Sequence, residues 1–246
     1  MPTIIHKVSL LALSLFTASA CASHWSYESE GSPEHWGNLD DAWRTCQSGK
    51  NQSPINIDST FNAHLAPLET HYTDGPATLM NNGHTIQAGE KEGTRDTVVI
   101  DGKIWTLQQF HFHAPSENTI HDKKYAMEMH LVHSNADGEI AVVAVMFDQG
   151  AKSQELEKLW RKMPAQPEQS ANIATHVDLN KLLPDNKTFW RFSGSLTTPP
   201  CSEGVTWIVL KHPLTLSAEQ LEKFSHTLHH PNNRPVQSLH GRMVVE

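Results

Sequence analysis

Three histidines in the middle of the chain have the spacing of a metal site. His111 and His113 lie two residues apart, and His130 follows further along. Side chains on a β-strand alternate between its two faces, so a strand over 103–113 directs both His111 and His113 to one face. If 125–133 forms the neighbouring strand, about 4.8 Å away, the imidazole of His130 can converge with the other two on one point.

Three neutral imidazoles suit Zn²⁺. They bind it at about 2.0–2.1 Å and leave a fourth tetrahedral position for water, whereas structural zinc sites close all four positions with protein ligands. Gln109 lies two residues before His111, and Glu128 lies two residues before His130. A metal-bound histidine usually donates its second N–H to such a partner. The alternative is a polar strand pair without metal, since roughly one His-x-His is expected by chance in this histidine-rich chain.

Size and charge restrict the class of protein. The chain has 246 residues, of which 38% are hydrophobic, and a formal net charge of −8. This length allows one domain that buries roughly 70–75% of the surface of its extended chain. The acidic balance argues against a nucleic-acid partner, because neutralising phosphates requires clustered Lys and Arg.

The pattern of a secretory signal peptide occupies residues 1–20. An apolar run over 8–16 is too short to span a bilayer, and small residues then allow cleavage after Ala20 or Ala22. No later run approaches the roughly 18 apolar residues of a membrane span, so we expect no transmembrane segment. We therefore predict a periplasmic or secreted protein with one mature domain over 23–246.

The cysteines agree with export. Cys21 lies in the cleavage region, where it is either removed or becomes the lipidated first residue of a lipoprotein. Cys46 and Cys201 remain as a pair, which in an oxidising compartment predicts a disulfide. Closing a loop of about 155 residues would contribute roughly 5 kcal/mol in the chain-entropy model. Two separate buried thiols are the alternative.

Strand patterns dominate the remaining chain. Asp101-Gly102 between two apolar runs is a two-residue hairpin signal. The run 139–147 is almost continuously apolar and predicts a central buried strand. The expected strands cover 77–80, 84–88, 97–100, 104–107, 139–147 and 205–210.

Helical patterns are few. Ser153 can cap a helix that extends to about Met163, and Ser217 with Gln220 forms a capping box for a second helix. Histidines near the end of the second helix are explained as cations at a helix C-terminus, with a second metal cluster as the alternative; they are His226, His229 and His230. The segment 23–50 has no sustained period and is predicted to pack onto the domain through aromatic anchors, namely Trp25, Tyr27, Trp36 and Trp43.

A series of motifs along 23–246 resembles the landmarks of the alpha-class carbonic anhydrases. In order they are GKNQSPINI (49–57), NNGH (81–84), QFHFH (109–113), SEN (116–118), EMHLVH (128–133), GSLTTPP (194–200) and NRP (233–235). The positions of Cys46 and Cys201 resemble the bacterial, exported type. The resemblance implies a mainly β, single-domain fold, with a central twisted, mostly antiparallel sheet of about ten strands and a few peripheral helices. It also implies cis peptide bonds at Ser53-Pro54 and Pro199-Pro200.

The resemblance assigns roles to individual residues. His111, His113 and His130 correspond to the zinc ligands, and Gln109 and Glu128 correspond to their hydrogen-bond partners. Further positions correspond to the groups that act on the substrate and line its pocket. Those positions are Glu117 and Thr197, which orient zinc-bound hydroxide; His84, the proton shuttle; Val132, Val142, Leu196, Thr198, Val205 and Trp207 around the substrate; and Tyr27, Asn82 and Gln87, which order solvent.

The implied function is zinc-dependent, reversible hydration of carbon dioxide to bicarbonate and a proton, by attack of zinc-bound hydroxide and proton transfer through histidine. A zinc-binding recognition module without activity and a zinc esterase are the alternatives, and a homodimer is left open. Two departures from the family pattern are visible. Asn118 stands where many members have His, and Ala114-Pro115 stands where animal members have Trp-Gly.

Overall fold

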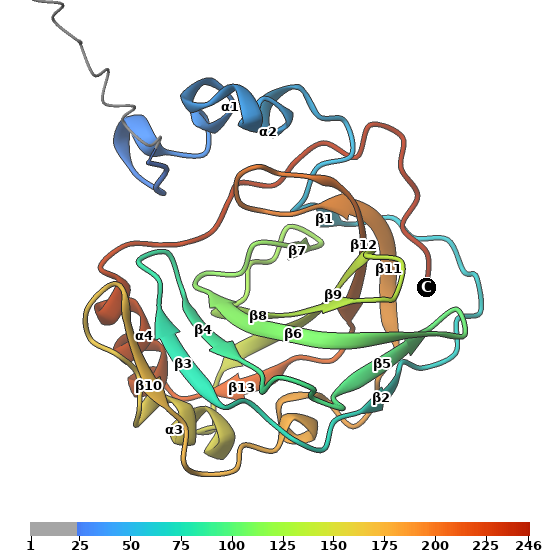
Figure 1. Ribbon diagram of the computed structural model, residues 1–246. Coiled ribbons are helices and arrows are strands. Elements are labelled where there is room, and N and C mark those ends of the chain that lie inside the picture. The colour runs from blue at the N-terminus through green and yellow to red at the C-terminus, as the bar shows by residue number, and fades with distance from the viewer. Residues whose placement is uncertain (1–23) are drawn as a thin grey trace, which may run out of the picture.

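Most of the regular structure in the computed structural model, which describes residues 24–246, consists of β-strands (Figure 1). The predicted signal peptide and Cys21 lie outside the described residues. The strands are β1 (Asn56–Ile57), β2 (Glu69–His71), β3 (Thr78–Asn81), β4 (Ile86–Gly89), β5 (Thr97–Ile100), β6 (Lys103–His113), β7 (Thr119–Ile120), β8 (Met127–Ser134), β9 (Ile140–Gln149), β10 (Gln169–Asn172), β11 (Phe189–Ser195), β12 (Glu203–Leu210) and β13 (Leu214–Leu216).

One 11-stranded sheet contains all of these strands except β1 and β7, which form a separate parallel pair. Its main path runs β10-β3-β4-β6-β8-β9-β12-β11, with β5 beside β6 and β2, and β13 beside β9. Neighbouring strands are antiparallel, except that β12 and β13 each run parallel to β9. The prediction of a mainly β protein with a mostly antiparallel central sheet is therefore confirmed.

Alternating side chains explain how this sheet is buried. In β6, Phe110 and Phe112 are fully buried in the larger apolar core. In β9, Val143 and Val145 belong to the same core, whereas Val142 and its alternate neighbours belong to a second core. Each face of the central strand β9 thus has its own apolar layer, which is why its sequence is apolar at every position from Ile140 to Phe147.

The helices lie around the outside of the sheet (Figure 1), and α3 and α4 pack on the larger apolar core. The predicted capping box of α4 is present, because the Ser217 hydroxyl accepts from Gln220 N–H and the Gln220 side chain accepts from Ser217 N–H. Ser153 caps α3 as predicted, although this helix ends at Trp160, earlier than expected. The helices and 3₁₀ turns are η1 (Ser29–Gly31), α1 (Trp36–Leu39), η2 (Asp41–Trp43), α2 (Thr45–Ser48), α3 (Gln154–Trp160), η3 (Leu179–Leu182) and α4 (Ala218–Leu228). Among residues 24–246, no helix is long and apolar enough to cross a membrane.

Short helices η1 to α2 make up the N-terminal segment, where no sustained period predicted them. The predicted packing of this segment is nevertheless right, since Trp36 is fully buried and Trp25, Tyr27 and Trp43 pack around it. The Trp36 indole N–H donates to the carbonyl of Gly31 at 2.8 Å. Tertiary contacts of the aromatic rings therefore hold helices that are too short to be stable alone.

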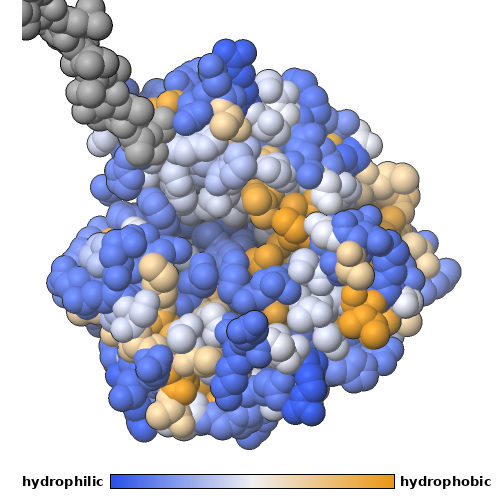
Figure 2. All heavy atoms as spheres, viewed as in Figure 1, coloured by the Kyte–Doolittle hydropathy of each residue, from blue (hydrophilic) through white to orange (hydrophobic). Residues whose placement is uncertain are grey.

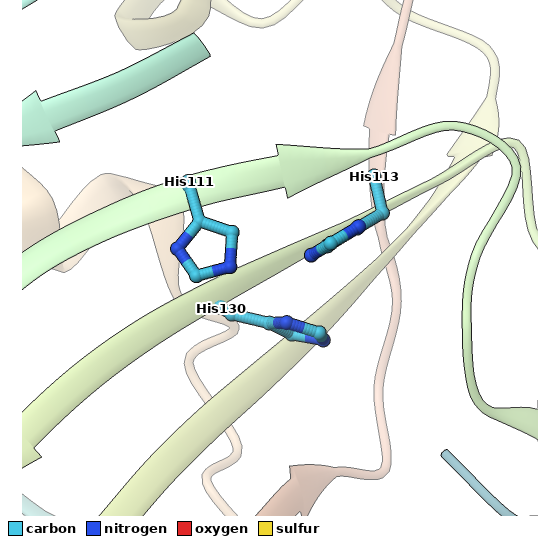
Figure 3. A group of neighbouring side chains, drawn as sticks. All are labelled: His111, His113 and His130. Atoms are coloured by element: carbon cyan, nitrogen blue, oxygen red, sulfur yellow. The ribbon is translucent and has the colours of Figure 1, made fainter. Parts of the chain in front are cut away.

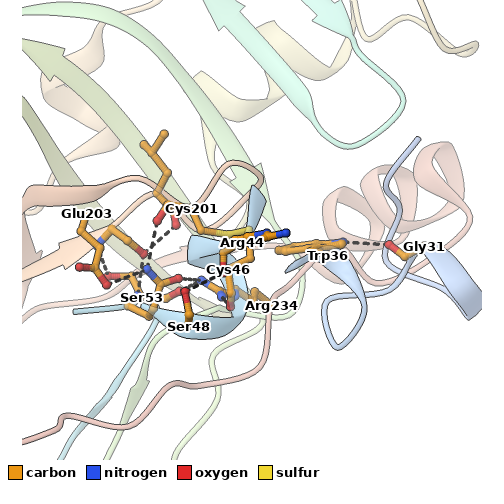
Figure 4. Close-up of a disulfide and its surroundings, with 12 residues drawn as sticks. Gly31, Trp36, Arg44, Cys46, Ser48, Ser53, Cys201, Glu203 and Arg234 are labelled. Carbon is orange, nitrogen blue, oxygen red and sulfur yellow. Dashed lines mark hydrogen bonds between the residues drawn. A yellow bond between two sulfur atoms is a disulfide. The ribbon is translucent and has the colours of Figure 1, made fainter. Parts of the chain in front are cut away.

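A disulfide joins this segment to the loop after β11 (Figure 4). The predicted bond between Cys46 and Cys201 is present. Next to it, the fully buried guanidinium of Arg234 donates to the carbonyls of Cys46 at 2.7 Å and Ser53 at 2.8 Å. Three segments that are remote in sequence are thereby held together near residue 200.

Three cis peptide bonds are present in the described chain. Those at Ser53-Pro54 and Pro199-Pro200 were expected from the family resemblance, whereas the one at Ala114-Pro115 was not.

Two acidic residues, Glu90 and Asp96, interact in the connection between β4 and β5. Asp96 is fully buried and accepts hydrogen bonds from the backbone N–H groups of Asp74 and Gly75, each at 2.8 Å. Burial first, and then the negative charge of Asp96, raise the pKa of the half-buried Glu90 from 4.5 to about 7. The folded state therefore favours the protonated form of Glu90.

This raised pKa predicts a loss of stability with rising pH. Glu90 disfavours folding increasingly as the pH rises from its unfolded pKa near 4.5 to its folded pKa of about 7. Because glutamine resembles the protonated acid, we expect Glu90→Gln to raise the thermal unfolding midpoint at pH 8 and to have little effect at pH 5, measured by differential scanning calorimetry. Glu92→Gln, at an exposed position in the same connection, is the control. An equal shift at both pH values would contradict the prediction.

Candidate metal centre

The pairing of β6 with β8 brings the three predicted histidines together (Figure 3). His111 lies directly opposite His130 in the register of the two strands. One nitrogen from each of the three imidazoles lies within 4.8 Å of the others. Within residues 24–246, this is the only group of three or more side chains with the spacing of metal ligands, so the alternative of a second cluster at the end of α4 finds no support there.

Two of the imidazoles are held by the partners that the sequence predicted. The Nδ1 of His111 lies 2.8 Å from Gln109 Oε1, and the Nε2 of His130 lies 2.9 Å from Glu128 Oε1. Because both oxygens accept hydrogen bonds, each of these nitrogens carries the ring proton. The lone pairs of His111 Nε2 and His130 Nδ1 are therefore free to bind a cation.

His113 has a partner that the sequence analysis missed. Its Nδ1 donates to the backbone carbonyl of Asn232 at 2.7 Å. The Asn232 side chain fixes that carbonyl, since its Oδ1 accepts from Ala114 N–H and its Nδ2 donates to the carbonyls of Phe112 and His84. A backbone carbonyl has no residue-type signature, and only the adjacent NRP motif pointed to this segment.

The donor set fits zinc. The Nε2 of His113 is a buried polar atom without a hydrogen-bond partner among the described residues. Burial is the largest cause that lowers the pKa of His111, His113 and His130, so these imidazoles are neutral. Three neutral nitrogens with fixed tautomers are the ligands of an open, catalytic zinc site.

Glu117 lies beside the ligand nitrogens. Its Oε2 is 3.6 Å from His113 Nε2 and 3.9 Å from His130 Nδ1, and its Oε1 accepts from Arg234 N–H at 2.8 Å. Burial raises the pKa of Glu117 to about 8, whereas the Thr197 hydroxyl and the Arg234 N–H lower it. A divalent cation on the three nitrogens would favour the ionised carboxylate, because it would be the largest local charge.

A cavity of about 130 Å³ opens beside His111 and His113, and Figure 2 shows a hollow near the middle of this face. The cavity is lined by Tyr27, Asn82, Gln87 and Thr198, which the sequence analysis placed in the substrate pocket or its solvent network, and by the predicted shuttle His84. Its lining consists of Trp25, Tyr27, Asn82, His84, Thr85, Gln87, Gln109, His111, His113 and Thr198. None of these lining residues is an Asp, Glu, Lys or Arg, so the cavity is suited to a small neutral molecule.

The side chains expected to form the apolar wall are also brought together. Val142, Val205 and Trp207 are buried in one apolar cluster, against which Val132 and Leu196 pack. The ring centroid of Trp207 lies 4.9 Å from that of His130. The apolar cluster therefore extends to the metal ligands.

His84 lies on the cavity wall in a setting that the sequence did not predict. Its ring stacks on Trp25, with centroids 3.7 Å apart and planes at 11°. Burial first, and then the neighbouring His24 and His230, lower the pKa of His84 to about 4. The pKa of His84 therefore lies well below the 6.5 of an unperturbed histidine, and the neutral ring prevails above about pH 4 in this conformation.

A large mixed sheet that carries an open three-histidine centre defines the class of zinc lyases that hydrate carbon dioxide. The family model of the eukaryotic-type carbonic anhydrases matches residues 31–246. A carbonic anhydrase of Klebsiella pneumoniae is 69% identical over 246 residues and is covered, like this chain, to 100%.

Solved structures agree with the sequence comparison. The alpha-carbonic anhydrase of Thermovibrio ammonificans, in complex with the inhibitor sulfanilamide, has a TM-score of 0.89 at 49% identity over 92% of this chain and 100% of that chain. Dioscorin complexed with ascorbate has a TM-score of 0.84 at 30% identity over 90% of this chain and 97% of that chain. The chain belongs to the eukaryotic-type, or alpha, carbonic anhydrase family.

Removing one ligand tests the metal centre. We expect His130→Ala to retain less than about one tenth of a zinc ion per chain after dialysis, because two imidazoles alone do not make a complete site. Inductively coupled plasma mass spectrometry would measure the metal, with one ion expected in the unmodified protein. His121→Ala, an exposed histidine beside β7, should keep its zinc. Full zinc occupancy in His130→Ala would contradict the assignment.

Proposed function

We propose that this chain catalyses the reversible hydration of carbon dioxide to bicarbonate and a proton, at a zinc ion held by His111, His113 and His130. The observation that carries the proposal is the convergence of three neutral imidazoles of fixed tautomer beside an uncharged cavity, in a member of the alpha carbonic anhydrase family. When bound, Zn²⁺ supplies a Lewis acid that makes water nucleophilic near neutral pH, as is established for carbonic anhydrases in general.

The partners of the ligands keep the centre ready for the metal. Gln109 and the Asn232 carbonyl are neutral acceptors, and Glu128 is buried and held by several donors. Each ring is therefore oriented before the metal arrives, which limits the conformational freedom that binding must remove.

Glu117 and Thr197 orient the attacking water. One oxygen of Glu117 is already occupied by Arg234 N–H. An ionised carboxylate can only accept, so the Thr197 hydroxyl donates to Glu117 and keeps its own lone pairs to accept a hydrogen bond from water in the cavity. A second lone pair of that water then points at the substrate carbon, and this orientation lowers the entropic part of the barrier.

The apolar cluster provides the complementary wall for carbon dioxide. Val142 and Trp207 are adjacent in the register of β9 and β12, and Val132 lies opposite Val142 on β8. The valines have no hydrogen-bonding group and the Trp207 indole N–H already donates to the Ser195 carbonyl, so a molecule without donors displaces water from this surface at little cost. Bicarbonate, which is charged, leaves such a surface readily.

Two other functions are less well supported. A recognition module without activity would not need three oriented ligands with Glu117 and Thr197 beside them. A dedicated esterase would need groups that bind the rest of its substrate, and the lining of the described cavity has no charged group for that purpose.

We propose in addition that residues 1–20 are a signal peptide and that 23–246 is the catalytic domain. The disulfide between Cys46 and Cys201 supports a location outside the cytoplasm, because such bonds persist in oxidising compartments.

Rapid mixing with carbon dioxide tests the activity. We expect the zinc-loaded protein to accelerate hydration, and removal of zinc by dipicolinate to lower the rate by at least about 10³-fold, because the Lewis acid supplies the nucleophile. Added zinc should restore the rate. A zinc-loaded protein that hydrates carbon dioxide no faster than buffer does would overturn the proposal.

His84 has a smaller expected effect. A pKa of about 4 makes the stacked ring a poor proton acceptor for zinc-bound water, whose pKa in carbonic anhydrases is near 7. We therefore expect His84→Ala to slow hydration in weak buffer by less than about tenfold, below the 10²–10⁴ of well-matched acid–base groups. Added imidazole should restore the hydration rate of His84→Ala, measured by stopped-flow. A slowing of much more than tenfold would contradict the expected small effect, and an unchanged rate in weak buffer would exclude the shuttle role.

A further inference from the structure

The carboxylate of Glu128 is the most heavily hydrogen-bonded group beside the metal ligands. Its Oε2 accepts from the backbone N–H groups of Glu117 and Asn118, each at 2.8 Å. Its Oε1 accepts from the side-chain amide of Asn118 at 2.7 Å and from His130 Nε2 at 2.9 Å. Asn118 thus provides two of the four donors, including the only side-chain donor besides the metal ligand itself.

The orientation of the Asn118 side chain is determined by a second contact. Its Oδ1 accepts from the backbone N–H of Ile55 at 3.0 Å. Because only the oxygen of the amide can accept, the NH₂ group must face Glu128. Asn118, Glu128 and Ile55 are all fully buried, so water does not compete for these bonds.

Unlike the histidine that many family members have at this position, the Asn118 amide donates to Glu128 without carrying a charge at any pH. The departure from the family pattern at this position therefore places a neutral donor on the carboxylate that holds His130. If the amide is removed, Glu128 Oε1 keeps His130 as its one donor among the described residues, and only the two backbone N–H groups on Oε2 still oppose rotation of the carboxylate about its last bond.

We propose that Asn118 is a positioning residue of the metal centre: its amide fixes Glu128, which fixes the ring of His130, and this increases the affinity for zinc. The inference rests on the zinc centre of the proposed function. Partners of ligands typically change metal affinity by about 10–100-fold, and Asn118 acts one bond further out, so the lower end of that range applies.

A purely structural role is the competing explanation, because Asn118 also joins the start of β1 to β7 through Ile55. Thr119 offers a matched control. Its hydroxyl donates to Asn56 Oδ1 at 2.8 Å, so it joins the same two strands without contacting Glu128. Thr119→Val therefore removes a strand contact and leaves the network around His130 intact.

The test compares the zinc dissociation constants of the unmodified protein, Asn118→Ala and Thr119→Val, measured by competition with a chelating dye of known affinity. We expect about a tenfold higher dissociation constant for Asn118→Ala and no change for Thr119→Val, while thermal unfolding of the metal-free proteins shows lower midpoints for both. If Asn118→Ala does not fold, Asn118→Ser replaces it, because its hydroxyl ends one bond short of the amide nitrogen.

An unchanged dissociation constant in the Asn118 variant would overturn the inference, and so would an equal increase in Thr119→Val. The unmodified protein in the same titration tests the proposed function separately: if it binds no zinc, the metal centre itself is wrong, whereas zinc binding with equal affinity in all variants removes only the role of Asn118.

Discussion

The register between β6 and β8 is the constraint on which the metal centre depends. Because side chains alternate along a strand, a slip of one residue would turn His111 and His113 into the apolar core and expose Phe110 and Phe112. The apolar face prevents this slip, since both phenylalanines are fully buried in the larger core. The geometry of the polar face is therefore maintained by hydrophobic burial on the opposite face.

Segments remote in sequence complete what the two strands begin. The Asn232 carbonyl orients His113, and the N–H of Arg234 occupies one oxygen of Glu117. The guanidinium of Arg234 in turn bonds to the carbonyl of Cys46, next to the disulfide. A chain of hydrogen bonds thus connects the N-terminal segment, the C-terminal segment and the carboxylate beside the ligands, so the site is a property of the whole domain.

The distribution of charge suits a small neutral substrate. The metal ligands are neutral because burial disfavours their charged forms, and the lining of the cavity has no carboxylate or basic side chain. Polar partners lie behind the ligands, while the cluster that contains Val142 and Trp207 forms an apolar surface near them. Neutral ligands would leave a bound cation its full charge for polarising water. The apolar surface binds water weakly, so carbon dioxide can replace water there.

What the sequence by itself determined was set by residue type and short-range period. Alternation identified the strands that carry His111 and His130, the in-phase positions of Gln109 and Glu128 identified their partners, and Ser217 with Gln220 identified a helix start. Tertiary structure alone decided the partner of His113, which is a backbone carbonyl common to every residue type. It also decided the pKa of His84, which is lowered by burial and by His24 and His230, both far away in sequence, and the contact of Asn118 with Glu128. Each of these depends on neighbours that only the folded chain brings together.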